Sequence, residues 1–517
     1  MNISEFEKFL TGNSINIIEG GKTVINSYVF IPKARLSSSA NRLNSTWIRA
    51  QYIILNESQS EEEIQEDVAK WQDLSIHPNQ YFIVESKTQG WKIYNYQGEY
   101  LGNEDAIVKL LSNNKKIGID KDNNVPSEYL RAMRTKPFLL LAGISGTGKS
   151  RIVKQMAFDS CPDNATLRSD LTSPGNYCLI EVKPNWHDST ELLGYESKIG
   201  GAHYQLTPFV KFLAKAMLYP DVPFFVCLDE MNLAPVEQYF AEFLSVLESR
   251  TKIDGHIVSE PLIKKSIFAN SEYERDLKHE LFDVKIKEKD ENGLKIYEAD
   301  LTEHEEQIYN SLKAQGLRIP ENVIVIGTVN MDETTHQFSR KVIDRAMTIE
   351  MNLPEGEPFM DFFNKGSELE YRDTPTSPSL YLATETKASD AVKTLTEENA
   401  EKTEWIKGAV AAFLTELNTA LDGTPFKIAY RVQNELMLYF YQLWLEDKTA
   451  EWETILKTAC DQILMMKVLP RIEGDDELLE KPLDKLVTFC ETYTNAQKKI
   501  KEMSKRLEQS RFTSFWP

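Results

Sequence analysis

The stretch that decides the fold reads Phe138-Leu-Leu-Leu-Ala-Gly143-Ile-Ser-Gly-Thr-Gly148-Lys149-Ser150. A continuous apolar run leads into a glycine-rich turn, and residues 151–158, which follow, have helical character. A buried strand, this GxxxxGKS turn and a helix, in that order, form the setting in which such a loop binds phosphates. The loop's N–H groups and the positive end of the helix then face the anion. The stretch therefore predicts a nucleoside triphosphate site.

Each residue type in this loop has a physical reason. The glycines let the backbone curl, a lysine can reach the β- and γ-phosphates, and a serine hydroxyl can bind Mg²⁺. Lys149 and Ser150 are the predicted lysine and serine. The full set of predicted nucleotide-binding residues here is Gly143, Ser145, Gly146, Thr147, Gly148, Lys149, Ser150 and Arg151.

Three further apolar runs follow along the chain, at residues 177–182, 224–228 and 323–326. Segments of helical texture separate them. Short apolar runs in this arrangement are typical of strands buried on both faces of a parallel sheet. We therefore expect an α/β domain with a parallel sheet.

Two acids, Asp229 and Glu230, end the run at 224–228. At the tip of a strand near the phosphate loop, Asp229 would hold Mg²⁺ through water, and Glu230 would orient and deprotonate the attacking water. A metal-bound acid cannot serve both roles. The alternative is that the two acids end a strand and cap the next helix.

Three polar residues farther along the chain are candidates for sensing or stabilising the γ-phosphate. Asn330 ends the fourth apolar run, where it could bind the phosphate or the lytic water, or serve as a turn residue. Arg345 could reach a neighbouring subunit's nucleotide as an arginine finger, or pair with Asp344 or Glu350 in its own chain. Arg431 is a candidate second sensor from a helical lid.

The sequence pattern divides the chain into three predicted regions. Residues 1–120 carry β-rich runs and one helical stretch, which predict a small α+β domain and a candidate for target recognition. Residues 125–355 hold the predicted nucleotide-binding domain, with a charged surface insertion near 252–320. Residues 356–517 show apolar positions at helical spacing, which predict a mainly helical lid and C-terminal region.

Composition narrows the function classes. The 517 residues carry a net charge of −20, whereas proteins that coat DNA are usually basic. The charge argues against a broad DNA-coating surface, but not against a local basic patch or a pore loop. No apolar run is long enough for a membrane span, and no signal peptide begins the chain. Its five cysteines have no CxxC spacing. We expect a cytoplasmic protein without membrane association, disulfides or zinc.

Residues 125–517 resemble AAA+ NTPases of the McrB type, the motor subunits of modification-dependent restriction systems. The resemblance rests on the phosphate loop and three further segments: Val182-Lys-Pro-Asn-Trp186-His-Asp188-Ser-Thr-Glu-Leu-Leu193-Gly194-Tyr195, Leu228-Asp229-Glu230-Met-Asn232-Leu-Ala-Pro and Gly327-Thr-Val-Asn330-Met-Asp332. The second of these four segments looks like the helix-2 insertion of that clade, whose hairpin would face the channel of a ring.

The resemblance implies an AAA+ sheet domain with a helical lid, a hexameric ring, and a partner nuclease of the McrC type. DNA would be bound by the N-terminal domain or the ring channel, in the service of antiviral defence. The substrate would be GTP or ATP with Mg²⁺. Matching residues would be Lys149, Ser150, Asp229, Glu230, Asn330, Arg345 and Arg431.

This sequence departs from the family at one place. McrB-type proteins often read MNTADR after the sensor strand, and here the chain reads Asn330-Met-Asp-Glu-Thr-Thr, without the arginine. The choice between GTP and ATP stays open. A second reading of the whole chain is a protein-remodelling chaperone of the MoxR or dynein-related branch, which shares the helix-2 insertion. A third is a scaffold that binds nucleotide with little turnover, against which the intact Glu230 argues.

Overall fold

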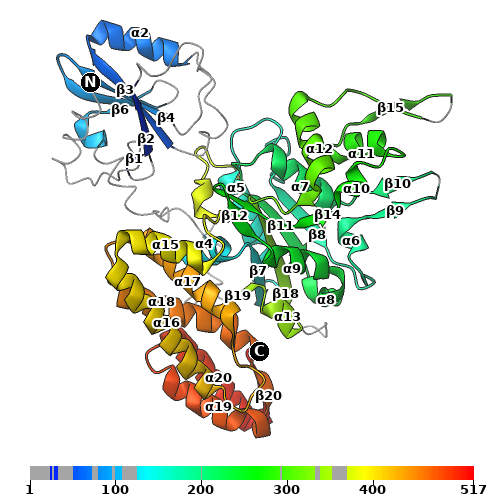
Figure 1. Cartoon of the computed structure of the whole chain (residues 1–517), viewed down its shortest axis with the longest axis vertical. Helices are drawn as coiled ribbons and strands as arrows, with labels where there is room; N and C mark the ends of the chain where they lie inside the picture. The colour runs from blue at the N-terminus through cyan, green and yellow to red at the C-terminus, as the bar shows by residue number, and fades with distance from the viewer. Residues whose placement is uncertain are drawn as a thin grey trace. The chain divides into compact units, whose positions relative to one another are not determined.

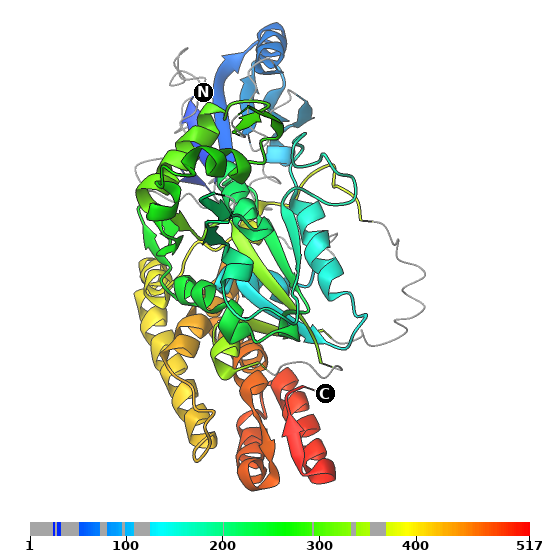
Figure 2. The ribbon, with the colours of Figure 1, turned by 90° about the vertical axis from the view of Figure 1, so that its right-hand side faces the viewer.

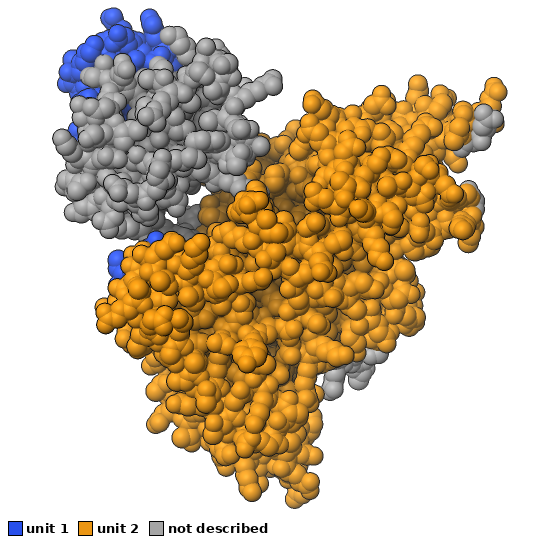
Figure 3. Space-filling view, in the orientation of Figure 1, with its two compact units in different colours: residues 1–122, 445–449 blue, residues 123–444, 450–517 orange. Residues whose placement is uncertain are grey.

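The computed structural model describes residues 24–25, 28–32, 51–72, 80–95, 99–107, 125–199, 201–291, 294–331, 338–351 and 369–516. The chain forms two compact units (Figure 3). Unit 1 comprises residues 1–122 and 445–449, and unit 2 comprises residues 123–444 and 450–517.

Unit 1 is built on a mixed sheet in which β2, β3 and β4 run parallel and the outer pairs run antiparallel. Helix α2 (Glu61–Gln72) joins β3 to β4 and buries Ile64 against Phe82 and Val84. The sequence predicts a hairpin around Gly90, and the antiparallel β4–β5 pair confirms it. The strands are β1 (Val24–Ile25), β2 (Tyr28–Pro32), β3 (Gln51–Gln59), β4 (Gln80–Ser86), β5 (Gly90–Asn95) and β6 (Tyr100–Gly102).

Unit 2 contains a five-stranded sheet in the order β19-β7-β18-β11-β8, with every neighbouring pair parallel. This confirms the expected parallel α/β domain. Helices cover both faces of the sheet (Figures 1 and 2), which is why its inner strands are apolar throughout. The strands are β7 (Phe138–Gly143), β8 (Tyr177–Glu181), β11 (Phe224–Asp229), β18 (Val323–Asn330) and β19 (Met347–Glu350).

Burial differs between the inner and outer strands. Every residue of β7 and β18 is buried, and only Asp229, at the tip of β11, is partly exposed in that strand. Strand β8 has no fully buried residue. The expectation that this run is buried on both faces was therefore wrong, because β8 lies at the sheet edge.

Several helices flank the sheet. They are α4 (Ser127–Thr135), α5 (Lys149–Ser160), α7 (Pro208–Leu218), η3 (Met231–Leu233), α8 (Val236–Tyr239), α9 (Ala241–Glu248) and α13 (Arg340–Ile343). In the part of the chain that the structure describes, no helix is long and apolar enough to cross a membrane.

A hairpin stands between β8 and α7, as the sequence predicts. After the short helix α6 (Thr190–Leu193), strands β9 (Tyr195–Ser197) and β10 (His203–Gln205) pair antiparallel. Gly194 has φ +84°, and a Cβ there would lie 2.2 Å from the Gln205 carbonyl oxygen. The hairpin base thus requires glycine. Ile199, beyond β9, is 88% exposed.

The charged stretch near 252–320 is a set of small folded elements. Helix α12 shows how such a polar sequence folds: Thr302 and Glu305 form a capping box, and the helix buries Tyr309 and Leu312. The charges lie mostly on the exposed faces of amphipathic elements. These elements are β12 (Thr251–Ile253), β13 (His256–Val258), β14 (Pro261–Ile263), α10 (Lys265–Phe268), α11 (Glu274–Leu281), β15 (Ile286–Lys289), β16 (Lys295–Tyr297), α12 (Glu303–Gln315) and β17 (Leu317–Arg318).

The C-terminal region is mainly helical and packs on the sheet domain as part of unit 2 (Figure 1). Arg134 of α4 joins the two parts: its Nε donates to Gln442 Oε1 at 2.9 Å, and its Nη1 donates to the Leu380 carbonyl at 3.0 Å. The elements are η4 (Pro378–Leu380), α15 (Ala388–Glu398), α16 (Ala400–Ala420), α17 (Tyr430–Glu446), α18 (Trp452–Ile463), η5 (Leu464–Val468), η6 (Leu469–Arg471), β20 (Glu473–Asp475), α19 (Asp476–Phe489), α20 (Thr494–Ser510) and β21 (Phe512–Ser514).

Candidate functional site

The glycine-rich turn lies between β7 and α5 at the carboxyl edge of the sheet. Gly146 and Gly148 adopt φ of +80° and +85°, a region that side chains with a Cβ rarely enter. Gly148 directly precedes the first turn of α5. The loop therefore wraps in front of a helix N-terminus, the geometry in which backbone N–H groups receive a phosphate.

Gly143 serves a different purpose from the other two loop glycines. A Cβ at this position would lie 2.4 Å from the Met351 carbonyl oxygen. The Met351 N–H also donates to the Ala142 carbonyl at 2.7 Å. The start of the loop is thus clamped against the chain that leaves β19, which fixes where the phosphates would sit.

The predicted phosphate-binding lysine lies inside the loop. Lys149 is buried, and its ammonium donates to the carbonyl oxygens of Gly143 at 3.0 Å and Ile144 at 2.7 Å. Ser145 and Gly146 are exposed along the loop, Thr147 donates from its hydroxyl to the Ile144 carbonyl at 3.1 Å, and Arg151 is exposed on α5. The lysine amine is therefore centred where the loop would receive the β- and γ-phosphates.

Ser150 and Asp229, the predicted Mg²⁺ ligands, meet directly. Ser150 Oγ donates to Asp229 Oδ1 at 2.5 Å, although the two residues come from α5 and β11. A hydroxyl and a carboxylate oxygen beside a phosphate loop suit Mg²⁺, which prefers oxygen ligands and retains water. The residues thus fit the ion: Ser150 would ligate it directly, and Asp229 through water.

A residue that the sequence analysis missed, Thr328 of β18, ties the two acids together. Its hydroxyl donates to Asp229 Oδ1 at 2.7 Å and accepts from the Glu230 N–H at 3.0 Å. One signal could have found it: Thr328 precedes Asn330 by one strand period, so both side chains lie on the same face of β18. In sequence, a threonine within an apolar run looks like an ordinary strand residue.

Glu230 is held in an unusual conformation. Its φ of 51° and ψ of 49° place a residue with a Cβ in the left-handed region. Asn330 Nδ2 donates to Glu230 Oε1 at 3.1 Å, and Asn232 Nδ2 donates to the Asn330 carbonyl at 3.2 Å. Backbone strain of this kind clusters at functional sites. Here it turns the carboxylate toward the predicted sensor asparagine.

The hydroxyl of Thr328 can be tested by Thr328→Val. We expect turnover to fall by about 10- to 100-fold, because the groups that the hydroxyl positions would drift out of reacting geometry. Phosphate release at saturating nucleotide measures the effect. Thr348→Val is the matched control, since Thr348 is equally buried in β19 and its hydroxyl bonds to none of the described residues. Equal rates for the two variants would remove Thr328 from the site.

Arg345 lies just after α13, and its Nε is buried with no hydrogen-bond partner among the residues that the structure describes. The two intrachain partners considered for it pair with other residues in this structure. Asp344 pairs with Arg471 at 3.0 Å, and Glu350 pairs with Lys499 at 2.5 Å. Among the residues that the structure describes, no ion pair engages the Arg345 guanidinium.

Arg431, the candidate lid sensor, begins α17 beside acids of the sheet domain. Its Nε donates to Glu248 Oε2 at 2.9 Å, and its Nη1 lies 3.9 Å from Asp344 Oδ2. These partners belong to α9 and to the segment after α13, not to the phosphate loop. Residues 332–337, where the sequence departs from the McrB pattern, lie outside the described residues.

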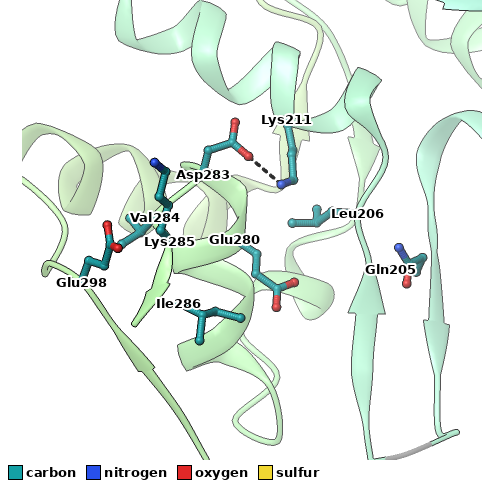
Figure 4. Close-up of a pocket in the computed structure, with 9 residues that line it drawn as sticks. All are labelled: Gln205, Leu206, Lys211, Glu280, Asp283, Val284, Lys285, Ile286 and Glu298. Atoms are coloured by element: carbon teal, nitrogen blue, oxygen red, sulfur yellow. Dashed lines mark hydrogen bonds and ion pairs between the residues drawn. The ribbon is translucent and has the colours of Figure 1, made fainter. Parts of the chain in front are cut away.

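A separate hollow of about 560 Å³ lies away from these residues, between α7, β10 and the start of β15 (Figure 4). Lys211 Nζ and Asp283 Oδ1 pair across it at 2.6 Å. It shares no residue with the phosphate loop. Its lining comprises Gln205, Leu206, Lys211, Glu280, Asp283, Val284, Lys285, Ile286 and Glu298.

The sheet order and the position of the loop together decide the fold class. Numbered along the chain, the parallel strands lie in the order 5-1-4-3-2. The glycine loop follows the first strand, the acid pair follows the third, and the asparagine ends the fourth. The fold is that of an AAA ATPase. A helical region follows the AAA sheet domain, and a small mixed-sheet unit precedes it.

Comparisons with known proteins add little beyond this fold. A family model described as a domain of unknown function, DUF8727, matches residues 385–512, which hold helices α15 to α20. No curated protein matches the chain. Among solved structures, one from Cytophaga hutchinsonii ATCC 33406, whose assignment as an ATPase is itself provisional, is 13% identical. The match covers 66% of this chain and 80% of that one, with a TM-score of 0.32.

Proposed function

We propose that this protein hydrolyses GTP or ATP as the ring motor of a McrBC-like restriction system and drives a partner nuclease on DNA. The observation that carries the hydrolytic part is the hydrogen-bonded chain from Ser150 through Asp229 and Thr328 to Glu230. These hydrogen bonds bring Ser150, Asp229 and Glu230 together beside the phosphate loop, which supports their proposed roles as metal ligands and base. The sequence resemblance to McrB-type proteins supports the motor and its partner.

In this proposal each side chain has one task. Lys149 and the loop N–H groups would bind the phosphates, and Ser150 and Asp229 would hold Mg²⁺, which would neutralise charge on the phosphate oxygens. Glu230 orients a water and accepts its proton. Asn330, hydrogen-bonded to Glu230 at 3.1 Å, aligns that carboxylate with the γ-phosphate. Positioning and electrostatics account for most catalysis in phosphoryl transfer.

Assembly into a ring, most simply a hexamer, would complete the site. Arg345 has no acidic partner among the described residues, as expected of a group that serves a neighbouring subunit. The β9–β10 hairpin would line the channel, where Ile199 is 88% exposed. DNA would be engaged by this channel or by unit 1. A separate McrC-like nuclease would cut.

The proposal is tested with the purified protein and a nuclease encoded by a neighbouring gene. Phosphate release is measured with GTP and with ATP, and DNA cleavage is measured with each nucleotide and with its non-hydrolysable analogue. We expect turnover with at least one nucleotide, and cleavage that requires both the nuclease and hydrolysis. Matched reactions without the nuclease serve as the control.

Other outcomes assign the protein elsewhere. Turnover with ATP alone, no cleavage under any condition and unfolding of a bound protein substrate would support the remodelling alternative. Absence of turnover with both nucleotides, with DNA and nuclease present, would contradict the motor and leave a nucleotide-binding scaffold.

A further inference from the structure

Lys467 is a fully buried lysine in the helical region, and it contacts the segment that carries Arg345. It lies in η5, a π-helical turn, with 0% exposure. Its ammonium donates to the carbonyl oxygens of Ala346 at 2.7 Å and Asp344 at 2.8 Å, with a longer contact of 3.4 Å to Ile343. Short π-helical turns are often found at functional sites.

The bonded carbonyls flank Arg345 on both sides. Helix α13 ends at Ile343, so the carbonyls beyond it have no helical partners of their own. Lys467 holds the peptide groups before and after Arg345, and the Arg345 N–H donates to the Val342 carbonyl at 2.9 Å. The backbone at Arg345 is therefore fixed, while its side-chain Nε has no hydrogen-bond partner in the described part of the chain. Such an arrangement suits a side chain that is presented to something outside its own chain.

A chain of ion pairs connects this lysine to the segment just before β7, at the opposite end of that strand from the phosphate loop. Lys467 pairs with Glu435 Oε2 at 2.9 Å, and Lys136 pairs with Glu435 Oε1 at the same distance. Lys136 also pairs with Glu248 at 2.7 Å, and β7 begins two residues later, at Phe138. One acid of α17 thus joins the strand that leads into the phosphate loop to the lysine that holds the Arg345 segment.

The lysine keeps its charge near neutral pH. Burial lowers the pKa of Lys467 to about 8, and Glu435 opposes this shift, whereas Lys136 adds to it and Asp344 opposes it more weakly. Below that pKa the group retains all the N–H donors of an ammonium ion. Two of them are used on the carbonyls at 344 and 346, and one faces Glu435.

We infer that Lys467 is a positioning residue, which holds the Arg345 segment from the helical region so that Arg345 is presented to nucleotide bound by a neighbouring subunit. This inference rests on the proposed ring NTPase. A second buried lysine shows the contrast: Lys499 pairs with the Glu350 side chain at 2.5 Å and leaves the carbonyls around Arg345 alone. The contact to backbone on both sides of Arg345 sets Lys467 apart from a simple buried ion pair.

Mixed rings give the test, because Arg345 and Glu230 of one active site would come from different subunits. Glu230→Gln protein keeps Arg345 and can donate it, and Arg345→Ala protein keeps Glu230 and can use a donated arginine. Each alone should be inactive. A random equal mixture should regain about a quarter of the wild-type rate, since half the subunits can hydrolyse and half of those adjoin a donor.

Lys467→Met is then introduced into one type of subunit at a time: the donor of Arg345, which carries Glu230→Gln, or the acceptor, which carries Arg345→Ala. On the donor, as Glu230→Gln/Lys467→Met, we expect the regained rate to fall by about 10²-fold, because a misplaced arginine loses its reacting geometry. On the acceptor, as Arg345→Ala/Lys467→Met, we expect the rate to stay within about twofold, because that subunit's own Arg345 segment is not in use.

Two controls separate positioning from folding. Lys499→Met on the donor removes a comparable buried charge and should preserve the regained rate. Glu435→Gln/Lys467→Met on the donor removes the opposing charge as well, which restores charge balance and still leaves the carbonyls unheld, so its regained rate should stay low. Equal loss on donor and acceptor, or no loss on the donor, would overturn the inference.

The failures can be told apart. If wild-type protein shows no turnover, the proposed function itself fails. If the wild type is active and the simple mixture regains nothing, Arg345 does not act across subunits, and the role of Lys467 fails with it while the hydrolytic site stands.

Discussion

Glu230→Gln is expected to lower nucleotide turnover by about 10²- to 10⁴-fold and to leave nucleotide binding intact, because the amide cannot accept the proton of the attacking water. The hydrogen bond from Asn330 reaches Oε1 at 3.1 Å, and a glutamine carbonyl oxygen accepts the same bond. The substitution therefore changes protonation chemistry without removing the contact that orients the side chain. Phosphate release and the binding of a fluorescent nucleotide, measured on the same preparation, check both halves of the expectation.

Glu237→Gln is a suitable control for this experiment. Glu237 lies on α8, close in sequence and exposed, and its substitution removes the same charge without touching the hydrogen-bonded chain. We expect it to behave as wild type. Substantial turnover by Glu230→Gln would mean that another group accepts the proton, and the assignment of the base would have to be withdrawn.

Arg345→Ala is expected to reduce turnover by about 10³- to 10⁵-fold, the range seen when an arginine finger is lost. The arginine would act on charge that develops in the transition state, so the rate at saturation should fall far more than nucleotide affinity. Steady-state kinetics over a range of nucleotide concentrations distinguish the two effects. A loss seen chiefly in KM would indicate ground-state binding instead.

Arg340→Ala provides the comparison. Arg340 is an exposed arginine on α13, where its guanidinium lies 4.8 Å from the centre of the Phe426 ring. Removing it deletes the same charge from the same segment and should cost little turnover. If the two variants are equally active, Arg345 contributes packing alone, and the mixed-ring experiment would show no recovery to explain.

The sheet and the first contacts of the site could be predicted because their signals are local. An apolar run long enough for one strand, followed by a glycine loop or by a pair of acids, indicates a buried strand whose carboxyl end carries functional residues. Parallel strands then bring Ser150, Asp229 and Asn330 together without further information, since the carboxyl ends of such strands share one edge. The α/β fold class was confirmed for this reason.

The remaining contacts depend on packing that no local pattern records. Glu435 and Lys467 are charged residues within helical segments, and such residues usually face water. Here both are buried, and they contact Lys136 and the carbonyls around Arg345, which lie far from them in the sequence. The helical character of the C-terminal region was predicted, but α19 was not singled out as a separate helix; it holds Pro482 in its interior, a position where proline usually disfavours a helix. Both cases were decided by tertiary contacts.

At Glu230, whose backbone is left-handed, folding stability and catalysis favour different residues. A residue with a side chain held there costs about 1–3 kcal/mol of folding free energy, and glycine would relieve that cost while deleting the acid. Selecting variants of this protein for thermal stability alone would therefore favour variants that are more stable but no longer hydrolyse nucleotide. Stabilised versions for practical use should be sought elsewhere in the fold, with position 230 left unchanged.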